Sequence, residues 1–366
     1  MNVLYLLGAL LLALVLSKTL VPLMISLGHK WSLLDLPGRH KRHERPVPVL
    51  GGIALFATVW VTLLTYWLLV PGSVMESGRE ILFVFCGALI VVLIGLSDDL
   101  KPITAGVKLL GQVAAGLVVY FGGLHVTLLS TPFGSVEVGS FSVFISVLWV
   151  VGLTNAINLI DGLDGLAGGV SLIGIVFLIA VGLLLGFSEG IILLVAMAGF
   201  LVPFLWYNRY PARIFLGDSG SMQLGYYFAV FSLLAPVKTY TASALYLPLV
   251  ALGLPLLEAG SSVFRRLISG RGVMRADRRH LFHYLSMAGF SPRQVVNTFY
   301  ALALVFGSSA LAMVFWNRLV VTVLLLVFMV VILVAFRIFV VSLCAPKRVH
   351  DRVSKHADNA DMEDNG

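Results

Sequence analysis

Asn155-Ala-Ile-Asn-Leu-Ile-Asp-Gly-Leu-Asp-Gly-Leu166 places two amides and two carboxylates at three-residue intervals in a chain that is otherwise mostly apolar. On a helix, positions three apart are surface neighbours, so this spacing predicts Asn158 beside Asp161 and Asp161 beside Asp164. The two glycines that follow the carboxylates weaken such a helix and let backbone or ligand approach closely. Two neighbouring carboxylates repel each other unless a cation lies between them, and a hard divalent cation suits oxygen ligands. The alternative is a polar helix end that faces water.

The composition excludes a soluble globular protein. The 366 residues are 59% hydrophobic and only 12% charged, whereas ordinary soluble domains have about 25% charged residues. The apolar residues form long blocks that can cross a bilayer core as helices, while isolated strands would leave unpaired backbone groups in lipid. A carboxylate at the bilayer centre costs about 2.5–3.5 kcal/mol on insertion scales, and this cost favours a functional role for the acidic stretch.

Eleven apolar blocks predict an all-α polytopic integral membrane protein with about eleven transmembrane helices. Residues 1–345 form a single transmembrane domain in this interpretation, and the polar residues 346–366 form a disordered cytoplasmic tail. The two cysteines, Cys86 and Cys344, lie in apolar blocks without metal-ligand spacing and are interpreted as packing residues. The predicted spans are 3–27, 48–70, 80–97, 105–122, 141–159, 166–186, 189–207, 222–236, 240–264, 297–316 and 319–343.

Basic residues are distributed unevenly between the two sets of loops. One set carries the basic residues of Lys30–Arg45, then Lys101, Arg209 and Arg213, then those of Arg265–Arg293 and of the tail, whereas the opposite set carries only Arg79, Lys238 and Arg318. The positive-inside rule therefore places the N-terminus outside and the C-terminus in the cytoplasm. Five carboxylates then fall at cytoplasmic helix ends or loops and predict a single site on that face: Asp98, Asp99, Asp161, Asp164 and Asp218.

Two further stretches carry these carboxylates. Asp98 and Asp99 end the third predicted span and point in different directions on a helix, so at most one ligates a metal while the other positions a substrate. Alone, this pair also fits an ordinary acidic helix end. Phe215-Leu-Gly-Asp-Ser-Gly-Ser221 precedes another span. Asp218 or one of the serines caps that helix, or Asp218 belongs to a metal–phosphate site in which the helix N-terminus faces the anion.

Two basic loops are candidates for anion binding. His40-Lys-Arg-His-Glu-Arg45 contains Arg42 and His43 and suits either a phosphorylated substrate or anionic lipid headgroups. The loop Arg275–His283 contains Arg279, His280 and His283. The two histidines only weakly indicate a zinc site, because no further nitrogen or sulfur ligand lies nearby. Beside three arginines they favour hydrogen bonding to an anion, with a solvated basic loop as the alternative.

The motifs described above, in their order along the chain, resemble those of the polyprenyl-phosphate N-acetylhexosamine-1-phosphate transferases of bacterial cell-surface glycan synthesis. The branch that the chain resembles is the undecaprenyl-phosphate N-acetylglucosamine-1-phosphate transferases. The similarity covers roughly residues 1–345, and Asn155–Leu166 is its most specific piece. The other matching pieces are Lys41-Arg-His43 with Gly51-Gly52, Asp98-Asp99, Gly217-Asp-Ser-Gly-Ser221 and the His280–His283 loop.

The resemblance implies that residues 1–345 are catalytic and transfer a sugar-1-phosphate from a UDP-N-acetylhexosamine to undecaprenyl phosphate. N-acetylglucosamine-1-phosphate is the expected group, and release of UMP would start a lipid-linked glycan such as O-antigen lipopolysaccharide or a cell-wall polymer. The implied cofactor is Mg²⁺, with Mn²⁺ as a substitute. The implied setting is the bacterial cytoplasmic (inner) membrane, with the active site facing the cytoplasm and no nucleic-acid partner. The oligomeric state stays open, with a homodimer as one option.

The resemblance also implies a role for each candidate residue. Asp218 would ligate Mg²⁺, Asp98 would position or deprotonate the lipid phosphate, and Asp99 would support the metal shell. Phe215 would stack on uracil. The nucleotide–metal pocket would be shaped by Asn155, Asn158, Asp161 and Asp164, the last two of which are counted with Asp98 and Asp99 as catalytic. Substrate phosphates would be held by Arg42, His43, Arg279, His280 and His283.

One departure from the family pattern concerns the sugar. Related enzymes carry a third histidine in the last loop where this chain has Phe282, and this leaves a 6-deoxy-N-acetylhexosamine open as donor. Val49-Leu-Gly-Gly52 differs from the Thr-Met-Gly-Gly element of the phospho-N-acetylmuramoyl-pentapeptide branch. The rival from another class is a transporter. Its sites would lie near the midplane on broken helices, whereas these carboxylates lie at one face and no internal repeat is evident.

Overall fold

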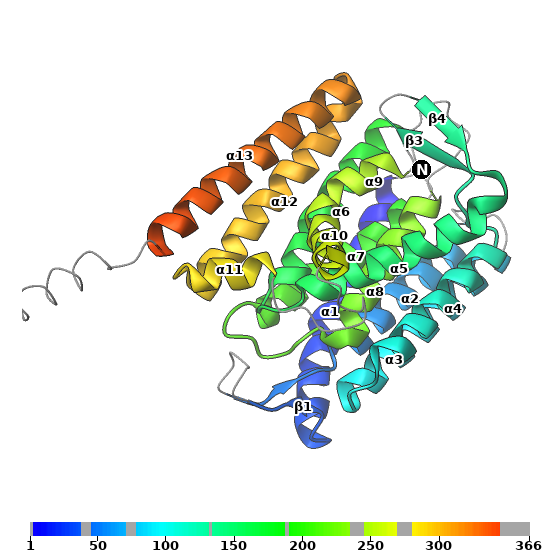
Figure 1. Cartoon of the computed structure of the whole chain (residues 1–366). Helices are drawn as coiled ribbons and strands as arrows, with labels where there is room; N and C mark the ends of the chain where they lie inside the picture. Colours follow the sequence, from blue (N-terminus) through cyan, green and yellow to red (C-terminus); the bar gives the residue numbers. More distant parts are fainter. Residues whose placement is uncertain are drawn as a thin grey trace, which may run out of the picture.

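A computed structural model of the chain is almost entirely helical, with two short hairpins (Figure 1). The predicted disordered tail lies outside the residues that it describes, as do Arg42, His43 and Arg279. The described residues are 3–37, 45–70, 78–131, 134–186, 190–234, 245–268 and 280–344.

Ten long helices and four short helical segments form the described structure. The long helices are α1 (Val3–Lys30), α2 (Gly51–Leu69), α3 (Gly78–Leu100), α4 (Ala105–Phe121), α5 (Ser142–Ile160), α6 (Leu166–Leu184), α7 (Ile191–Asn208), α8 (Gly217–Leu234), α12 (Pro292–Phe315) and α13 (Arg318–Cys344). The short ones are α9 (Tyr246–Ala251), α10 (Gly253–Ile268), α11 (Leu281–Met287) and the 3₁₀ turn Gly139–Phe141. The antiparallel hairpins are β1 (Leu34–Asp35) with β2 (Val47–Pro48), and β3 (Leu128–Thr131) with β4 (Gly134–Glu137).

Seven helices in the described ranges are long and apolar enough to cross a membrane. They are α1, α2, α3, α5 with its preceding 3₁₀ turn, α6, α7 and α12, while α4 and Arg318–Ile332 of α13 are shorter apolar segments. This confirms a polytopic all-α membrane protein. The count of eleven spans and the orientation of the termini stay predictions.

The predicted span 240–264 is wrong as a single helix. Its described part divides into α9, which ends at Ala251, and α10, which begins at Gly253. Pro255 has no N–H to donate to the carbonyl of Ala251, so a continuous helix would lose a bond at this point. The break separates α9 from α10 within the predicted span.

The central helix is α8, which packs against α2, α3 and α5 (Figure 1). Every residue in Ser219–Leu234 is buried, whereas outer helices expose large apolar side chains such as Leu324 of α13, which is 63% exposed. The few polar groups inside α8 have partners, as buried polar groups must. Gln223 Nε2 donates to the Gly52 carbonyl at 3.0 Å, and the Tyr226 hydroxyl donates to the Val84 carbonyl at 2.9 Å.

The sequence motifs gather at one end of this bundle. The C-termini of α3, α5 and α7 and the N-termini of α4, α6 and α8 meet there, because each pair is joined by a short connection. The β3–β4 hairpin, which connects α4 to α5, lies at the opposite end (Figure 1). The fold therefore brings segments that are more than a hundred residues apart to a common surface.

Candidate active site

An open cavity of about 1340 Å³ lies at the end where the motifs meet. The structure brings seven of the predicted site residues to its wall: Asp98, Asp99, Asp161, Asp164, Phe215, Asp218 and His283. These residues come from the end of α3, the α5–α6 turn, the start of α8 and α11. The spatial convergence that the topology predicted is thus present, while the role of each residue stays a prediction.

The acidic stretch in Asn155–Leu166 is a helix end and a turn, so the expectation that Asp161 and Asp164 are neighbours on one helix is wrong, whereas the predicted break between the spans 141–159 and 166–186 is confirmed. Helix α5 ends at Ile160 and α6 begins at Leu166. Gly165 has a φ of 78°, a left-handed conformation that glycine adopts without steric cost. Asp161 and Asp164 consequently meet in the cavity as turn residues and not as neighbours on one helix face.

The turn is tied to the segment between α7 and α8. Asp164 Oδ2 accepts a hydrogen bond from the backbone N–H of Ala212 at 2.9 Å. Asn208 Oδ1 accepts from the backbone N–H of Gly165 at 3.1 Å, and its Nδ2 donates to the Ile214 carbonyl at 2.8 Å. Asn208 was not among the predicted residues. These contacts hold the two loops that form one side of the cavity in a fixed relation.

Asp161 lies among other carboxylates in a partly buried position. Burial, followed by the negative charges of Asp218, Asp99 and Asp164, raises the pKa of Asp161 to about 8. A cation that entered the cluster would favour the charged form and lower this pKa again. Asp161 is therefore a group whose charge depends on what occupies the cavity.

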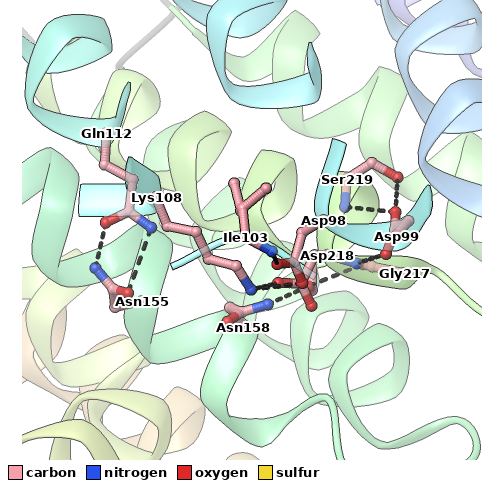
Figure 2. Close-up of polar contacts among 11 residues, drawn as sticks. Asp98, Asp99, Ile103, Lys108, Gln112, Asn155, Asn158, Gly217, Asp218 and Ser219 are labelled. Atoms are coloured by element: carbon pink, nitrogen blue, oxygen red, sulfur yellow. Dashed lines mark hydrogen bonds and ion pairs between the residues drawn. The ribbon is translucent and has the colours of Figure 1, made fainter. Parts of the chain in front are cut away.

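Lys108 of α4 is the cation at the centre of the acidic cluster (Figure 2). Its Nζ lies 2.7 Å from Asp98 Oδ2 and also contacts Asp218 Oδ2. Asp98 Oδ1 in addition accepts from the backbone N–H of Ile103 at 2.9 Å. The sequence interpretation missed Lys108. The available signal was a lone lysine inside an apolar block, because such a charge needs a partner in a membrane protein.

Asp99 caps the N-terminus of α8 from another helix (Figure 2). Its Oδ1 accepts from the backbone N–H of Asp218 at 2.7 Å, and its Oδ2 accepts from the N–H and hydroxyl of Ser219 at 3.1 and 2.7 Å. A carboxylate at this position satisfies free amides and complements the helix dipole. At Asp218 and Ser219 the amides are thus neither capped by a local side chain nor free to face a substrate anion, because Asp99 already occupies them.

Glycines let the start of α8 pack closely between α2 and α3. A Cβ on Gly52 or on Gly95 would collide with the backbone of Ser219. The backbone N–H of Gly51 donates to the Phe215 carbonyl at 3.1 Å, and the N–H of Phe215 donates to the Pro48 carbonyl at 2.8 Å. The Gly51-Gly52 pair of the first loop therefore positions the predicted uracil-stacking residue and the Asp218 loop.

The two predicted amides serve as links between helices. Asn155 Nδ2 donates to Gln112 Oε1 at 2.5 Å, and Gln112 Nε2 donates back to Asn155 Oδ1 at 3.3 Å (Figure 2). Asn158 Nδ2 donates to Ser221 Oγ at 2.9 Å. In the part of the chain that the structure describes, neither amide lines the cavity. They join α5 to α4 and to α8 just behind the cavity wall.

The histidines of α11 lie at different depths. His283 and Phe282 line the cavity, whereas His280 is buried behind them and stacks on Phe282 with ring centroids 5.7 Å apart. Phe282 also packs against Gly162, where an added Cβ would meet its ring. A direct contact of His280 with a ligand in the cavity is thus not supported by its position. Phe282, at the place of the third family histidine, closes the wall between α11 and the α5–α6 turn.

Another part of the cavity wall carries exposed arginines, which the sequence interpretation used only for orientation, beside aromatic rings that it missed. Arg209 lies over the Trp206 ring at 4.7 Å, and Arg293 lies over the Tyr210 ring at 5.6 Å. Arg213 lines the same side of the cavity. Cation–π pairs of this kind contribute about 0.5–1 kcal/mol at exposed sites. The cavity therefore has an acidic wall, two of whose carboxylates contact Lys108, and a basic wall of arginines.

Comparison with known proteins places the chain in a family. A model described as Glycosyl transferase family 4 matches residues 81–235. A probable undecaprenyl-phosphate N-acetylglucosaminyl 1-phosphate transferase of Bacillus subtilis (strain 168) is 33% identical over 322 residues, which cover 86% of this chain and 87% of that protein. This identity and coverage are sufficient to assign the family. The chain belongs to the polyprenyl-phosphate N-acetylhexosamine-1-phosphate transferases.

Two further relatives extend this comparison. The undecaprenyl-phosphate alpha-N-acetylglucosaminyl 1-phosphate transferase of Escherichia coli (strain K12) is 32% identical over 283 residues, 72% of each chain. The decaprenyl-phosphate N-acetylglucosaminephosphotransferase of Mycobacterium tuberculosis (strain ATCC 25618 / H37Rv) is 32% identical over 307 residues, 77% of this chain and 76% of that one. The predicted family is confirmed. The matched family model includes the acidic wall and Lys108 but ends before α11.

The acidic wall of this transferase fits a divalent cation. Asp98 and Asp218 already converge on one positive charge, the ammonium of Lys108. Among the described residues, no group of three or more His, Cys, Asp or Glu side chains is arranged to hold a metal. Mg²⁺ is commonly bound by only one or two carboxylates together with substrate phosphates. The donor set therefore suits an ion that enters with a phosphorylated substrate better than a permanent structural metal.

Proposed function

We propose that this transferase moves N-acetylglucosamine-1-phosphate from UDP-N-acetylglucosamine to undecaprenyl phosphate and releases UMP. The observation that carries the proposal is the cavity lined by Asp98 and Asp218, both of which contact Lys108, in a chain with the family membership established above. Two phosphorylated substrates repel each other, so their approach requires a cation and basic groups, which this cavity brings together. The product would start a lipid-linked cell-surface glycan in the bacterial inner membrane.

The reaction needs little acid–base chemistry. An oxygen of the lipid phosphate attacks the phosphorus next to the sugar, and the bond from that phosphorus to the bridging oxygen breaks, so that UMP leaves with this oxygen. A phosphate monoester has a second pKa of about 6, so the attacking oxygen is already deprotonated near neutral pH. The main task of the site is then to hold the two substrates in line and to stabilise charge.

The chain supplies the groups for that task. Mg²⁺, when bound, would neutralise the diphosphate and the departing UMP, and Asp218 and Asp98 are the residues that would hold it. Lys108 Nζ contacts the same two carboxylates and would add a second positive charge near the phosphates. Phe215 offers a ring to the base, and His283 offers a donor from α11. The arginine wall attracts the anionic substrates.

Release of UMP tests this proposal directly. Detergent-solubilised protein is incubated with UDP-N-acetylglucosamine, undecaprenyl phosphate and Mg²⁺, and UMP and the lipid product are measured. We expect release that requires the acceptor, stops on chelation and resumes with Mg²⁺ or Mn²⁺. A parallel panel of UDP-N-acetylhexosamines, including a 6-deoxy sugar, ranks the donors. No UMP release would contradict the proposed reaction, and release only with another donor would contradict the proposed sugar.

The proposed cytoplasmic orientation has its own test. After replacement of Cys86 and Cys344, single cysteines are placed at Lys101, next to the cavity, and at Thr127, next to the β3–β4 hairpin at the other end. Both positions are exposed. An impermeant thiol reagent applied to intact cells should label the Thr127→Cys protein and leave the Lys101→Cys protein unlabelled until the cells are opened. The reverse pattern would place the cavity outside.

A further inference from the structure

Glu258 is a buried carboxylate that lies just behind the cavity. It belongs to α10, is 7% exposed and points to the start of α11. Its Oε1 and Oε2 accept from the backbone N–H of Leu281, the first residue of α11, at 3.2 and 3.4 Å. Removing a carboxylate from water costs several kcal/mol, so a buried acid is retained only where its contacts compensate for this cost.

The start of α11 depends on this carboxylate. His280 is the N-cap residue of the helix, and its side chain makes no capping hydrogen bond. Glu258, 23 residues earlier in the chain, supplies the negative charge that a helix N-terminus favours. Its Oε2 also lies 3.7 Å from Nδ1 of His280, a ring nitrogen that has no hydrogen-bond partner in the described part of the chain. Glu258 therefore faces both the backbone and the side chain at this helix start.

Two residues of α11 reach the cavity from this start. Phe282 follows Leu281 directly, stacks on His280 and packs against Gly162 of the α5–α6 turn. His283 has its ring 4.2 Å from that of Phe282 and lines the cavity. A seven-residue helix has little stability of its own, so its position depends on such outside contacts.

We propose that Glu258 is a positioning residue for the reaction: from α10 it holds the first turn of α11 and so sets where Phe282 and His283 stand in the cavity wall. This proposal rests on the proposed function, since it assigns to His283 a place against the substrates. Glu258 acts through α11 and does not itself line the cavity. The same carboxylate lies 3.7 Å from Nδ1 of His280, and the ring of His280 stacks on Phe282, so both contacts of Glu258 bear on the residues that reach the cavity.

The experiment combines kinetics with a readout that is independent of activity. Glu258→Ala, Glu258→Gln, His283→Ala and the double variant Glu258→Ala with His283→Ala are purified. UMP release gives kcat and KM, and hydrogen exchange measured by mass spectrometry reports on the Leu281–Met287 amides. The matched control is Ser146→Ala, because the Ser146 hydroxyl also accepts from a distant backbone amide, that of Val126 at 2.9 Å, near the opposite end of α5.

We expect Glu258→Ala to lower kcat/KM by about 10- to 100-fold, as loss of an outer carboxylate partner does, and to speed exchange in α11. Glu258→Gln keeps an acceptor for Leu281 but lacks the charge, so it should fall between wild type and alanine. In the His283→Ala background, Glu258→Ala should cost less than about threefold, since coupled residues are not additive. Ser146→Ala should leave both readouts near wild type.

Two outcomes would overturn the proposal. Unchanged exchange in α11 would show that Glu258 does not hold the helix. Faster exchange with fully additive kinetics would show a structural cap that does not act through His283. If the wild-type protein releases no UMP, the proposed function fails, and the exchange measurement still decides whether Glu258 fixes α11.

Discussion

Two parts of the cavity wall carry opposite charges and are built in different ways. On the wall of α3, α4 and α8, Asp98, Asp99 and Asp218 each have a fixed partner in the protein, and the start of α8 is buried between α2 and α3. On the other wall, Arg209 and Arg293 lie over rings of Trp206 and Tyr210 that are 69% and 46% exposed.

This contrast separates preorganised charge from adaptable charge. Groups held by several contacts keep their geometry without a ligand, so they stabilise a transition state without reorganisation cost. Exposed arginines are screened by salt and adjust to the ligand that arrives. We therefore expect changes on the acidic wall to act mainly on kcat, and changes on the basic wall to act mainly on KM.

The largest effect is expected at Asp218, where Asp218→Asn keeps the shape and removes the charge. Turnover should fall by about 10²–10⁴-fold if one electrostatic stabiliser is lost, with little change in melting temperature without ligand. Mg²⁺ with UDP-sugar should stabilise the wild type by mass action and the variant much less. Glu80→Gln, at the other end of the bundle, is the control and should keep wild-type turnover. Near-normal turnover with an undiminished Mg²⁺-dependent shift would place the metal elsewhere.

Lys108 should give the second largest effect. Lys108→Gln leaves Asp98 and Asp218 facing each other without a cation, and we expect kcat to fall by about 10²-fold with KM changed far less. The melting temperature without Mg²⁺ should drop, because the two partly buried carboxylates lose the positive charge that they share. Excess Mg²⁺ should restore more stability to this variant than it adds to wild type. If only KM changed, Lys108 would act as an adaptable charge, like the exposed arginines.

The partly buried carboxyl group of Asp161 on the preorganised side should make the stability of the protein depend on pH. Its pKa of about 8 in the folded protein exceeds the ordinary value of 3.8, so between these values the folded state binds more protons than the unfolded state. Stability must then fall as pH rises through this interval, and the destabilisation is complete above the folded pKa. In chelator, the melting temperature of wild type should decline between about pH 5 and pH 9. Asp161→Asn should flatten this decline, and an identical decline in both proteins would contradict the assignment.

The smallest effect is expected on the basic wall. Arg293→Gln should raise KM for the UDP-sugar by about two- to fivefold at low salt, as expected for an exposed charge worth less than about 1 kcal/mol. The difference should shrink at 1 M salt, where screening acts within about 3 Å. Arg318→Gln, at the first residue of α13 and at the other end of α12, is the control. A large loss of kcat at Arg293 would mean that this wall is preorganised as well.

The sequence by itself determined the class of the molecule and the place of its site. Composition and block length are sufficient for a polytopic helical membrane protein, because the cost of polar groups in lipid leaves few alternatives. The order of the motifs along the chain was sufficient to recognise the family. The positions of the acidic stretches at helix ends predicted that these stretches lie on one face of the membrane protein. The helix argument for Asp161 and Asp164 failed because a left-handed glycine and contacts to Asn208 and Ala212 make this stretch a turn.

Only the tertiary structure decided how each polar group is used. Asp99 caps α8 across 119 residues, Lys108 joins Asp218 across 110, and Glu258 reaches α11 from a separate helix. Asn155 and His280 were predicted at the substrate but lie behind the cavity wall, paired with Gln112 and stacked on Phe282. Periodicity reports only on neighbours a few positions apart. A long-range partner is selected by close packing, such as the approach of Ser219 to Gly52 and Gly95, and by the need to satisfy every buried charge.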